Sequence, residues 1–326
     1  MKKIISAALI LLVVSGLWLL NTSRHRTHNQ RFFLMDTIVE FKVEGDKEHA
    51  ETAMKHALEE LRRIDSTFGY QQSVLTELNA RHIIRNQELY SLIEFSLEVN
   101  KNSNGAFSLT LRPILDSWGF SGTHAYQVPE NSDFERWKSL PGDSGIILFD
   151  DGLTVKTHEG ILIDLGAVAK GYAADNAARI MKEDNIAAGL VNAGGDIMAF
   201  GDRDWQVGIK HPRAPGIFAT IPLRNRAIAT SGDYERFFIK DGTRYCHILD
   251  PETGLPSRRY MSATVVAQSC TQADAWATAL FVKGIETLKD FFSQHDMDWI
   301  VIDNNGKVYA SDALKEYCPD HISTTP

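Results

Sequence analysis

An acidic and a hydroxyl side chain lie four residues apart in a segment of small, mostly apolar residues. Asp274 and Thr278 belong to the stretch ADAWATAL at 273–280, and side chains at positions i and i+4 lie on the same face of a helix. Two hard oxygen donors with little bulk around them can bind Mg²⁺ and leave coordination positions for phosphate oxygens. The same spacing also occurs on plain helix surfaces, but this stretch is too apolar for a solvated face. The segment is therefore a candidate cation site.

A glycine turn between two regular elements offers a place for a phosphate. The segment IDLGAVAKGYAAD at 163–175 predicts a buried strand that ends in a turn and opens a helix, with Lys170 near the helix start. Backbone N–H groups at a helix start suit a phosphate. The glycine spacing is not that of a Walker loop. A turn that needs glycine only for its backbone angles is the alternative.

Two further regions combine glycines with polar side chains. The stretch LVNAGGDI at 190–197 ends an apolar strand with a glycine pair; such a pair lets a ligand approach the backbone, although a bulge or tight turn fits equally well. The stretches ATSGDYERF at 229–237 and HILDPETG at 247–254 are dense in hydroxyl, acidic and basic groups. His247, at a strand end and just before Asp250, can act as a general base near neutral pH. A structural histidine is the alternative.

The elements that must position these groups follow from hydrophobic periodicity. Alternating residues predict a strand at Thr37–Val43, and helical spacing from Ala50 to Ile64 predicts an amphipathic helix. A second helix is predicted at Leu89–Val99, ahead of the helix stop Asn104-Gly105. The aromatic segment Phe107–Phe120 is predicted to be irregular.

Short strands dominate the second half of the chain, and helices interrupt them. The predicted hairpins pair Ile146–Phe149 with Leu153–Lys156, Phe237–Lys240 with Arg244–Ile248, and Ile300–Asp303 with Lys307–Ala310. The predicted helices are Ala169–Asn185, Ala273–Lys283 and Ile285–His295. Strands and helices that mix without a strand-helix-strand rhythm predict an α+β fold. No repeat or Pro-rich linker divides residues 31–326, which are predicted to form one continuous catalytic domain.

Composition limits the classes of function. The 326 residues, 44% of them hydrophobic, can bury a sizeable core. A formal net charge of -8 and a sequence pI of about 5.8, without a block of Lys or Arg, argue against a nucleic-acid partner. Cys246, Cys270 and Cys318 are odd in number and widely spaced, which fits neither a disulfide framework nor a zinc site.

The N-terminal segment, residues 1–30, predicts export. Lys2 and Lys3 precede an apolar run from Ile4 to Leu20, and a polar, basic linker follows. Because no A-x-A cleavage site follows the run, we expect an uncleaved signal anchor on the outer, periplasmic side of the inner membrane rather than a cleaved, periplasmic form.

Taken in this order, the segments resemble the ApbE family of FAD:protein FMN transferases. The resemblance runs from about Phe33 to Ala310 and is carried by seven motifs: M-D-T at 35–37, F-S-L-T-L-R-P-I-L-D-S-W-G at 107–119, I-D-L-G-A-V-A-K-G-Y-A-A-D, L-V-N-A-G-G-D, A-T-S-G-D-Y-E-R, H-I-L-D-P-E-T-G-L-P and A-D-A-W-A-T-A-L. It implies a T-fold-like α+β domain and Mg²⁺-dependent transfer of FMN from FAD to a Thr or Ser of an acceptor, commonly a membrane-bound electron-transport subunit.

The resemblance also implies roles for individual residues. Asp274, Thr278 and the backbone carbonyl of Ala167 are the expected ligands of Mg²⁺ or Mn²⁺. From the chemistry of phosphoryl transfer itself, His247 or Asp250 is the expected base, and Lys170 with the N–H groups of the glycine turn is expected to stabilise charge on the phosphate. The expected FAD contacts are Met35, Phe68, Ala106, Phe107, Ser108, Asp164, Lys170 and His247. Two positions depart from the family pattern, because Asp36 stands where Gly is common and Ser108 where Asp is common.

Two other functions fit the same site. A metal-dependent FAD pyrophosphatase would use water as the acceptor and release FMN and AMP. A non-catalytic FAD-binding protein would not need the acid, the hydroxyl and the imidazole together.

Overall fold

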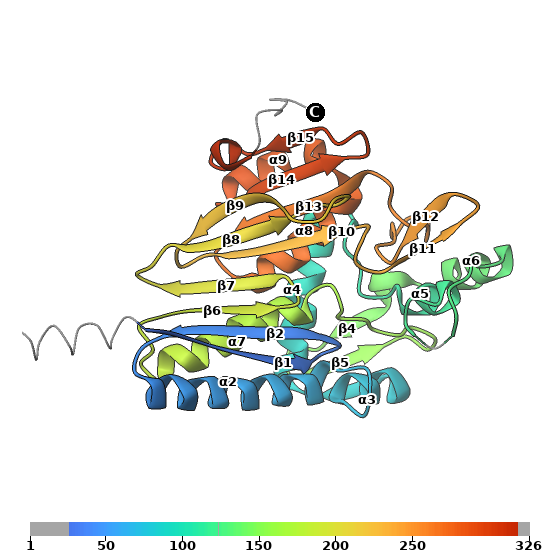
Figure 1. The fold of residues 1–326 in the computed structure, drawn as a ribbon. Helices are drawn as coiled ribbons and strands as arrows, with labels where there is room; N and C mark the ends of the chain where they lie inside the picture. Colours follow the sequence, from blue (N-terminus) through green and yellow to red (C-terminus); the bar gives the residue numbers. More distant parts are fainter. Residues whose placement is uncertain (1–25, 123, 319–326) are drawn as a thin grey trace, which may run out of the picture.

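An eight-stranded antiparallel sheet forms the centre of the molecule (Figure 1). The computed structural model describes residues 26–122 and 124–318. The strand order is β1-β2-β6-β7-β10-β13-β14-β15. The strands are β1 (Thr27–Leu34), β2 (Thr37–Glu44), β6 (Ala188–Ala193), β7 (Asp196–Gly201), β10 (Ala227–Gly232), β13 (Tyr260–Ala267), β14 (Asp298–Asp303) and β15 (Val308–Ala310). The mixed α+β class predicted from the sequence is confirmed.

Helices cover one face of this sheet. The helices are α2 (Lys47–Phe68), α4 (Gln87–Asn102), α7 (Ala169–Glu183), α8 (Cys270–Lys283) and α9 (Ile285–Gln294). Every second strand residue points toward them; on β2 these residues are Val39, Phe41 and Val43, all fully buried. Such burial of alternate strand residues against an apolar helix face drives folding through the area removed from water.

A two-stranded hairpin covers the opposite face. It consists of β8 (Trp205–Lys210) and β9 (Ile217–Leu223). Its inward residues pack on the other set of alternating strand side chains, so that on β10 Ile228 belongs to this second core while Ala227 and Ala229 belong to the first. The sheet is therefore buried on both faces in its central part, whereas the outward residues Phe33 and Ile38 of β1 and β2 stay exposed.

Smaller elements extend the molecule beyond the sheet. A three-stranded sheet pairs β3 (Ile83–Arg85), β5 (Thr154–Thr157) and β4 (Ile146–Leu148), next to α3 (Val74–Arg81). The hairpin of β11 (Phe237–Lys240) and β12 (Thr243–Cys246) packs with α5 (Arg112–Trp118) and α6 (Asn131–Lys138) through an aromatic cluster around Trp118. The Trp118 indole N–H donates to Gly254 O at 2.9 Å, which ties α5 to the segment after His247.

Most predicted elements form, with two corrections. Phe107–Phe120 is not irregular throughout, since α5 starts with Pro113 in its first turn, where the missing N–H costs nothing, and ends at Gly119 with φ 81°. The strand predicted before the glycine turn does not form, because the Ile163 N–H donates to Asn79 Oδ1 and the Asp164 N–H to Leu109 O instead of to a neighbouring strand. The proposed boundary at residue 31 falls inside β1.

The apolar run Ile4–Leu20 and the export prediction that rests on it lie outside the described residues. Within 26–122 and 124–318, no helix is long and apolar enough to cross a membrane.

Candidate active site

Two buried carboxylates and one ammonium meet where α7, α8 and the sheet come together. Lys170, in the first turn of α7, places Nζ 2.6 Å from Asp196 Oδ2 and 3.4 Å from Asp274 Oδ2. Asp196 is the first residue of β7, Asp274 lies near the start of α8, and the two acids are 4% and 5% exposed. The fold therefore brings two of the predicted site residues, Lys170 and Asp274, into contact. It also places Asp196, which was not predicted, against Lys170.

Opposing forces set the pKa values in this cluster. Burial alone would lower the pKa of Lys170, but the charges of Asp196 and Asp274 outweigh it and raise the pKa well above that of an ordinary lysine. Burial and the Asp274 charge raise the pKa of Asp196, while Lys170 acts in the opposite direction. The ammonium is therefore charged at neutral pH and compensates buried negative charge.

A glycine lets the two helices come close enough to form the cluster. A Cβ at Gly171 would lie 2.2 Å from Cys270 O and 2.9 Å from Asp274 Cβ. The Gly171 N–H instead donates to Asp274 Oδ2 at 3.0 Å. Asp175, one turn further along α7, accepts hydrogen bonds from the Cys270 and Thr271 N–H groups and so caps α8. Both contacts fix the position of α8 against α7.

The oxygen donors at this place fit a hard divalent cation. Thr278 lies one turn after Asp274 on α8, and its Oγ1 is 3.2 Å from Ser231 Oγ on β10. Asp196 Oδ2 is buried, and the ammonium of Lys170 lies 2.6 Å from it. Ala167 lies in the turn before α7. The described part of the chain holds no group of three or more His, Cys, Asp or Glu suited to a metal, so neutral oxygens would complete such a site.

The backbone of the glycine turn is less available to a phosphate than the sequence suggests. The Gly166 N–H donates to Asp164 Oδ1 at 2.7 Å, and the Gly171 N–H is taken by Asp274. The side chain of Lys170 is thus the main positive group that this turn offers.

Asp164, an expected FAD contact, is held by two further side chains. The Tyr70 hydroxyl donates to Asp164 Oδ1 at 3.0 Å, and Arg112 Nη1 lies 3.9 Å from Asp164 Oδ2. The Arg112 guanidinium lies over the Tyr70 ring at 4.9 Å. Burial and then the Asp164 charge raise the pKa of Tyr70, which keeps this hydroxyl a donor.

His247 follows β12 and presents a defined tautomer. Its Nδ1 lies 3.2 Å from Arg236 O, and a carbonyl only accepts, so Nδ1 carries the proton and Nε2 carries a lone pair. Burial, the Arg236 charge and the Lys170 charge together lower the pKa of His247 to about 3, although the bond to Arg236 O opposes this. The imidazole is neutral at physiological pH, as a proton acceptor must be.

Asp250, the alternative base, has a structural contact. Its Oδ1 accepts the Glu252 N–H at 2.8 Å, and its carbonyl accepts the Gly254 N–H at 2.8 Å. These bonds close the turn after His247. His247 is therefore the better placed of the two candidates.

Met35 lies in a tight turn beside the glycine pair. Met35 and Asp36 have φ values of 54° and 55° and connect β1 to β2. The Gly194 N–H donates to Ile38 O at 3.1 Å, and a Cβ at Gly194 would lie 2.4 Å from Thr37 Oγ1. The M-D-T and N-A-G-G-D motifs, far apart in sequence, are thus neighbours.

Of the remaining expected FAD contacts, three are buried in the core and one is hydrogen-bonded to a neighbouring carboxylate. Phe68, Ala106 and Phe107 are only 3%, 3% and 1% exposed and pack in the main core. Ser108, which replaces the more common Asp, donates to Asp143 Oδ1 at 3.0 Å. Asp143 also accepts from Thr110 Oγ1 at 2.8 Å, so a carboxylate is still present next to this segment.

Sequence reasoning did not single out Asp196, Tyr70 and Asp143, which contact the expected site residues Lys170, Asp164 and Ser108. Asp196 had a signal, since it directly follows the glycine pair of N-A-G-G-D. Asp143 had none, because only the fold brings it to Ser108, 35 positions away.

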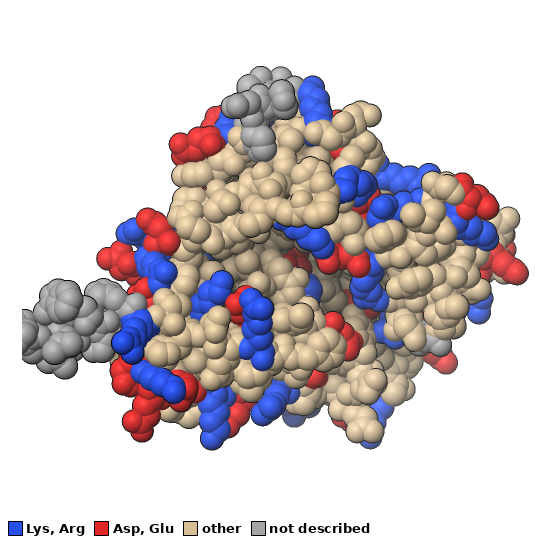
Figure 2. All heavy atoms as spheres, in the orientation of Figure 1, with Lys and Arg blue, Asp and Glu red and all other residues tan. Residues whose placement is uncertain are grey.

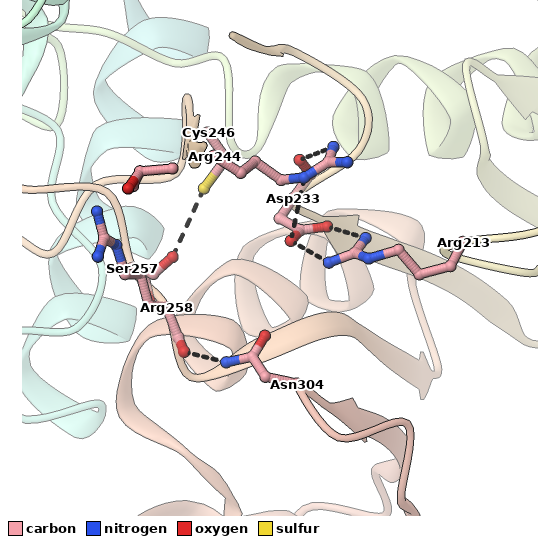
Figure 3. Close-up of a pocket in the computed structure, with 8 residues that line it drawn as sticks. Arg213, Asp233, Arg244, Cys246, Ser257, Arg258 and Asn304 are labelled. Atoms are coloured by element: carbon pink, nitrogen blue, oxygen red, sulfur yellow. Dashed lines mark hydrogen bonds and ion pairs between the residues drawn. The ribbon is translucent and has the colours of Figure 1, made fainter. Parts of the chain in front are cut away.

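A hollow opens between the sheet and the part that carries β11 and β12, with acidic and basic side chains along its walls (Figure 2). Close to it, a cavity of about 220 Å³ is lined by Arg213, Asp233, Thr243, Arg244, Cys246, Ser257, Arg258 and Asn304 (Figure 3). Arg213 and Asp233 form a two-pronged ion pair there, with distances of 2.7 and 2.6 Å. None of the residues expected to contact FAD lines this cavity, although Cys246 precedes His247.

A comparison with protein-family models identifies the family to which these motifs belong. The model of the ApbE family matches residues 35–301. The chain belongs to the ApbE family. An FAD:protein FMN transferase of Klebsiella pneumoniae is 27% identical over 89% of this chain and 93% of its own length. The ApbE protein of Thermotoga maritima superposes with a TM-score of 0.83 at 32% identity, covering 90% of this chain and 100% of its own. The flavin transferase ApbE of Vibrio cholerae gives a TM-score of 0.75 at 25% identity over 90% of this chain.

These likenesses confirm three of the expectations: the family, the α+β fold and the transferase class of enzyme. The roles of single residues, the metal and the cellular location stay predictions.

Proposed function

We propose that this enzyme transfers FMN from FAD to a Thr or Ser hydroxyl of an acceptor protein and releases AMP, with Mg²⁺ or Mn²⁺ bound. The observation that carries the proposal is a charged lysine between two buried carboxylates, near enough to a neutral imidazole for its charge to lower the pKa of that imidazole. ApbE relatives named FAD:protein FMN transferase support the choice of substrates.

The chain's own residues supply charge and alignment. Lys170 carries a full positive charge that can neutralise oxygens of the pyrophosphate, because its raised pKa keeps it protonated. Asp274, Thr278 and the Ala167 carbonyl, with Asp196 beside them, would hold the divalent cation. That cation, when bound, supplies charge neutralisation at the phosphate oxygens.

His247 takes the proton in this scheme. The acceptor hydroxyl oxygen forms a bond to the FMN phosphorus while the bond from that phosphorus to the AMP oxygen breaks. The hydroxyl proton moves to His247 Nε2, which the Nδ1–H bond to Arg236 O leaves free and oriented. A negatively charged pyrophosphate nearby raises the pKa of an imidazole, and so makes this nitrogen a stronger base when FAD is bound.

The acceptor that we propose is a membrane electron-transport subunit carrying the flavinylated Thr or Ser. The support is the predicted export segment at residues 1–30 and the usual setting of the family. The location that we propose is accordingly the periplasmic side of the inner membrane, anchored or cleaved.

The test incubates the full chain with FAD, Mg²⁺ and a domain carrying a candidate acceptor Thr, and then measures the mass of the acceptor. A gain of one FMN unit together with free AMP supports the transferase. Free FMN and AMP without a gain would identify a pyrophosphatase, and intact FAD with every acceptor tested would contradict catalysis. A Thr→Val acceptor is the matched control, because it keeps the shape and removes the hydroxyl.

A further inference from the structure

The ammonium of Lys170 lies between two buried acids. Its Nζ contacts Asp196 Oδ2 at 2.6 Å and both oxygens of Asp274 at 3.4 and 3.5 Å. Both acids are almost fully buried, so water cannot compensate their charge, and Lys170 is the positive group in contact with both. A buried carboxylate that lost this partner would carry a large desolvation penalty.

We propose that Lys170 and the divalent cation compete for the same carboxylate pair, Asp196 and Asp274, and that metal binding releases Lys170 toward the phosphates. Lys170 is thus an internal counter-ion that keeps the two acids in place before metal and substrate arrive. The inference rests on the proposed metal dependence of the enzyme.

Charge and geometry favour an exchange over simple addition. Two carboxylates and one ammonium leave one negative charge, whereas a divalent cation together with the ammonium would place three positive charges against two negative ones at close range. Asp196 Oδ2 is in contact with the Lys170 ammonium, so its lone pairs become available to a metal once Lys170 moves away. The Lys170 side chain is 31% exposed and can swing outward on its flexible stem.

Other charged groups around the cluster do not replace Lys170. Arg236 lies near His247, which contacts its backbone carbonyl and whose pKa its charge lowers, and it forms no ion pair with Asp196 or Asp274 within the described residues. Asp175 is itself an acid and accepts hydrogen bonds from the start of α8, so it supplies no positive charge to Asp196. The exchange therefore has two positive participants, the ammonium and the metal.

The first test measures Mn²⁺ binding to the full chain without FAD, by the loss of the free Mn²⁺ signal in electron paramagnetic resonance. Lys170→Met removes the competitor, so its Kd for Mn²⁺ should fall at least about fivefold below that of the unchanged chain, a usual coupling between two sites. Lys182→Met removes an exposed lysine from the same helix and should leave the Kd unchanged. Asp196→Asn should raise the Kd.

The second test needs no variant and so does not depend on how Lys170→Met folds. An ammonium held against two buried carboxylates is shielded from acylating reagents, whereas a Lys170 side chain that has swung outward is accessible to them. Saturating Mg²⁺ should therefore increase the labelling rate of Lys170, read by peptide mass spectrometry, while the rate at Lys182 stays constant.

The outcomes separate this inference from the proposed function. If the unchanged chain binds no Mn²⁺, the metal dependence itself is wrong. If it binds Mn²⁺ but Lys170→Met, still folded by circular dichroism, binds equally or more weakly, the competition is wrong and the metal site stands. An unchanged labelling rate of Lys170 at saturating Mg²⁺ would refute the release in the same way.

Discussion

Replacing Gly171 by Ala tests whether the site depends on the close approach of α7 and α8. Alanine is the better helix former, by about 1 kcal/mol, so helix propensity alone predicts a more stable protein. The new Cβ, however, would lie 2.2 Å from Cys270 O and 2.6 Å from Cys270 C, and these backbone atoms cannot rotate away. Overpacking of this kind costs about 1–3 kcal/mol.

The same change also weakens a hydrogen bond. Moving the helices apart stretches the 3.0 Å bond from the Gly171 N–H to Asp274, and bonds to charged groups contribute about 1.5–3 kcal/mol. After the gain in propensity is subtracted, we expect the free energy of unfolding to fall by about 1.5–5 kcal/mol. A misplacement of about 1 Å at Asp274 would lower the transfer rate about 100-fold.

Urea unfolding of the full chain, followed by circular dichroism, measures the stability change as a shift of the midpoint at constant m. Lys182→Ala on the exposed side of α7 is the control; it loses only a cation–π contact with Phe200 and should change the free energy of unfolding by at most about 1 kcal/mol. A Gly171→Ala protein as stable as the unchanged chain would show that the helices do not pack as closely as described, and would remove the basis for the Lys170–Asp274 contact.

Three further outcomes follow from the site. Asp274→Ala should abolish metal-dependent FMN transfer in the acceptor-mass assay, and undiminished transfer would sink the assignment of Asp274 to the metal. His247→Gln should bind FAD with similar affinity in fluorescence titration but lose about 10²–10⁴ in kcat, because the proton acceptor is gone; equal kcat would make His247 structural. Since the pKa of His247 falls from 6.5 to about 3 on folding, the unfolded chain binds more protons between these values, so this group's contribution to stability is full above pH 6.5 and is lost as the pH falls toward 3. The difference in unfolding free energy between the unchanged chain and His247→Gln, measured from pH 4 to 8, should show that slope, and a flat difference would contradict the lowered pKa.

The sequence predicts those elements of the fold that neighbouring residues determine, and it fails where contacts between distant residues decide. Helix α2 and the hairpin around Asp241-Gly242 follow from periodicity and turn residues, so they were predicted with small errors at their ends. Helix α5 was missed because Pro113 is usually a helix breaker and only its place in the first turn makes it acceptable. The strand predicted at Ile163 failed because a side chain, Asn79, supplies the acceptor that a neighbouring strand would have offered.

The cluster of Lys170, Asp196 and Asp274 is the part of the site that sequence patterns predict least well, because its members are far apart in the chain. Lys170 and Asp274 are 104 positions apart, and motif resemblance alone brought both into one hypothesis. Asp196 joins the cluster because the β6–β7 turn places it next to Lys170 at the start of α7. This position depends on the pairing of strands in the sheet.

Opposite pKa shifts on two basic side chains give the strongest argument for their separate roles. Lys170 lies against two carboxylates and its pKa is raised, whereas His247 lies near Arg236 and Lys170 and its pKa is lowered. Groups whose surroundings drive their pKa values apart in one site mark the charged partner and the proton acceptor. The two shifts are also linked, because the Lys170 charge itself helps to keep His247 neutral. A bound pyrophosphate next to His247 adds negative charge and raises the pKa of the imidazole, which strengthens the base only when the substrate is in place.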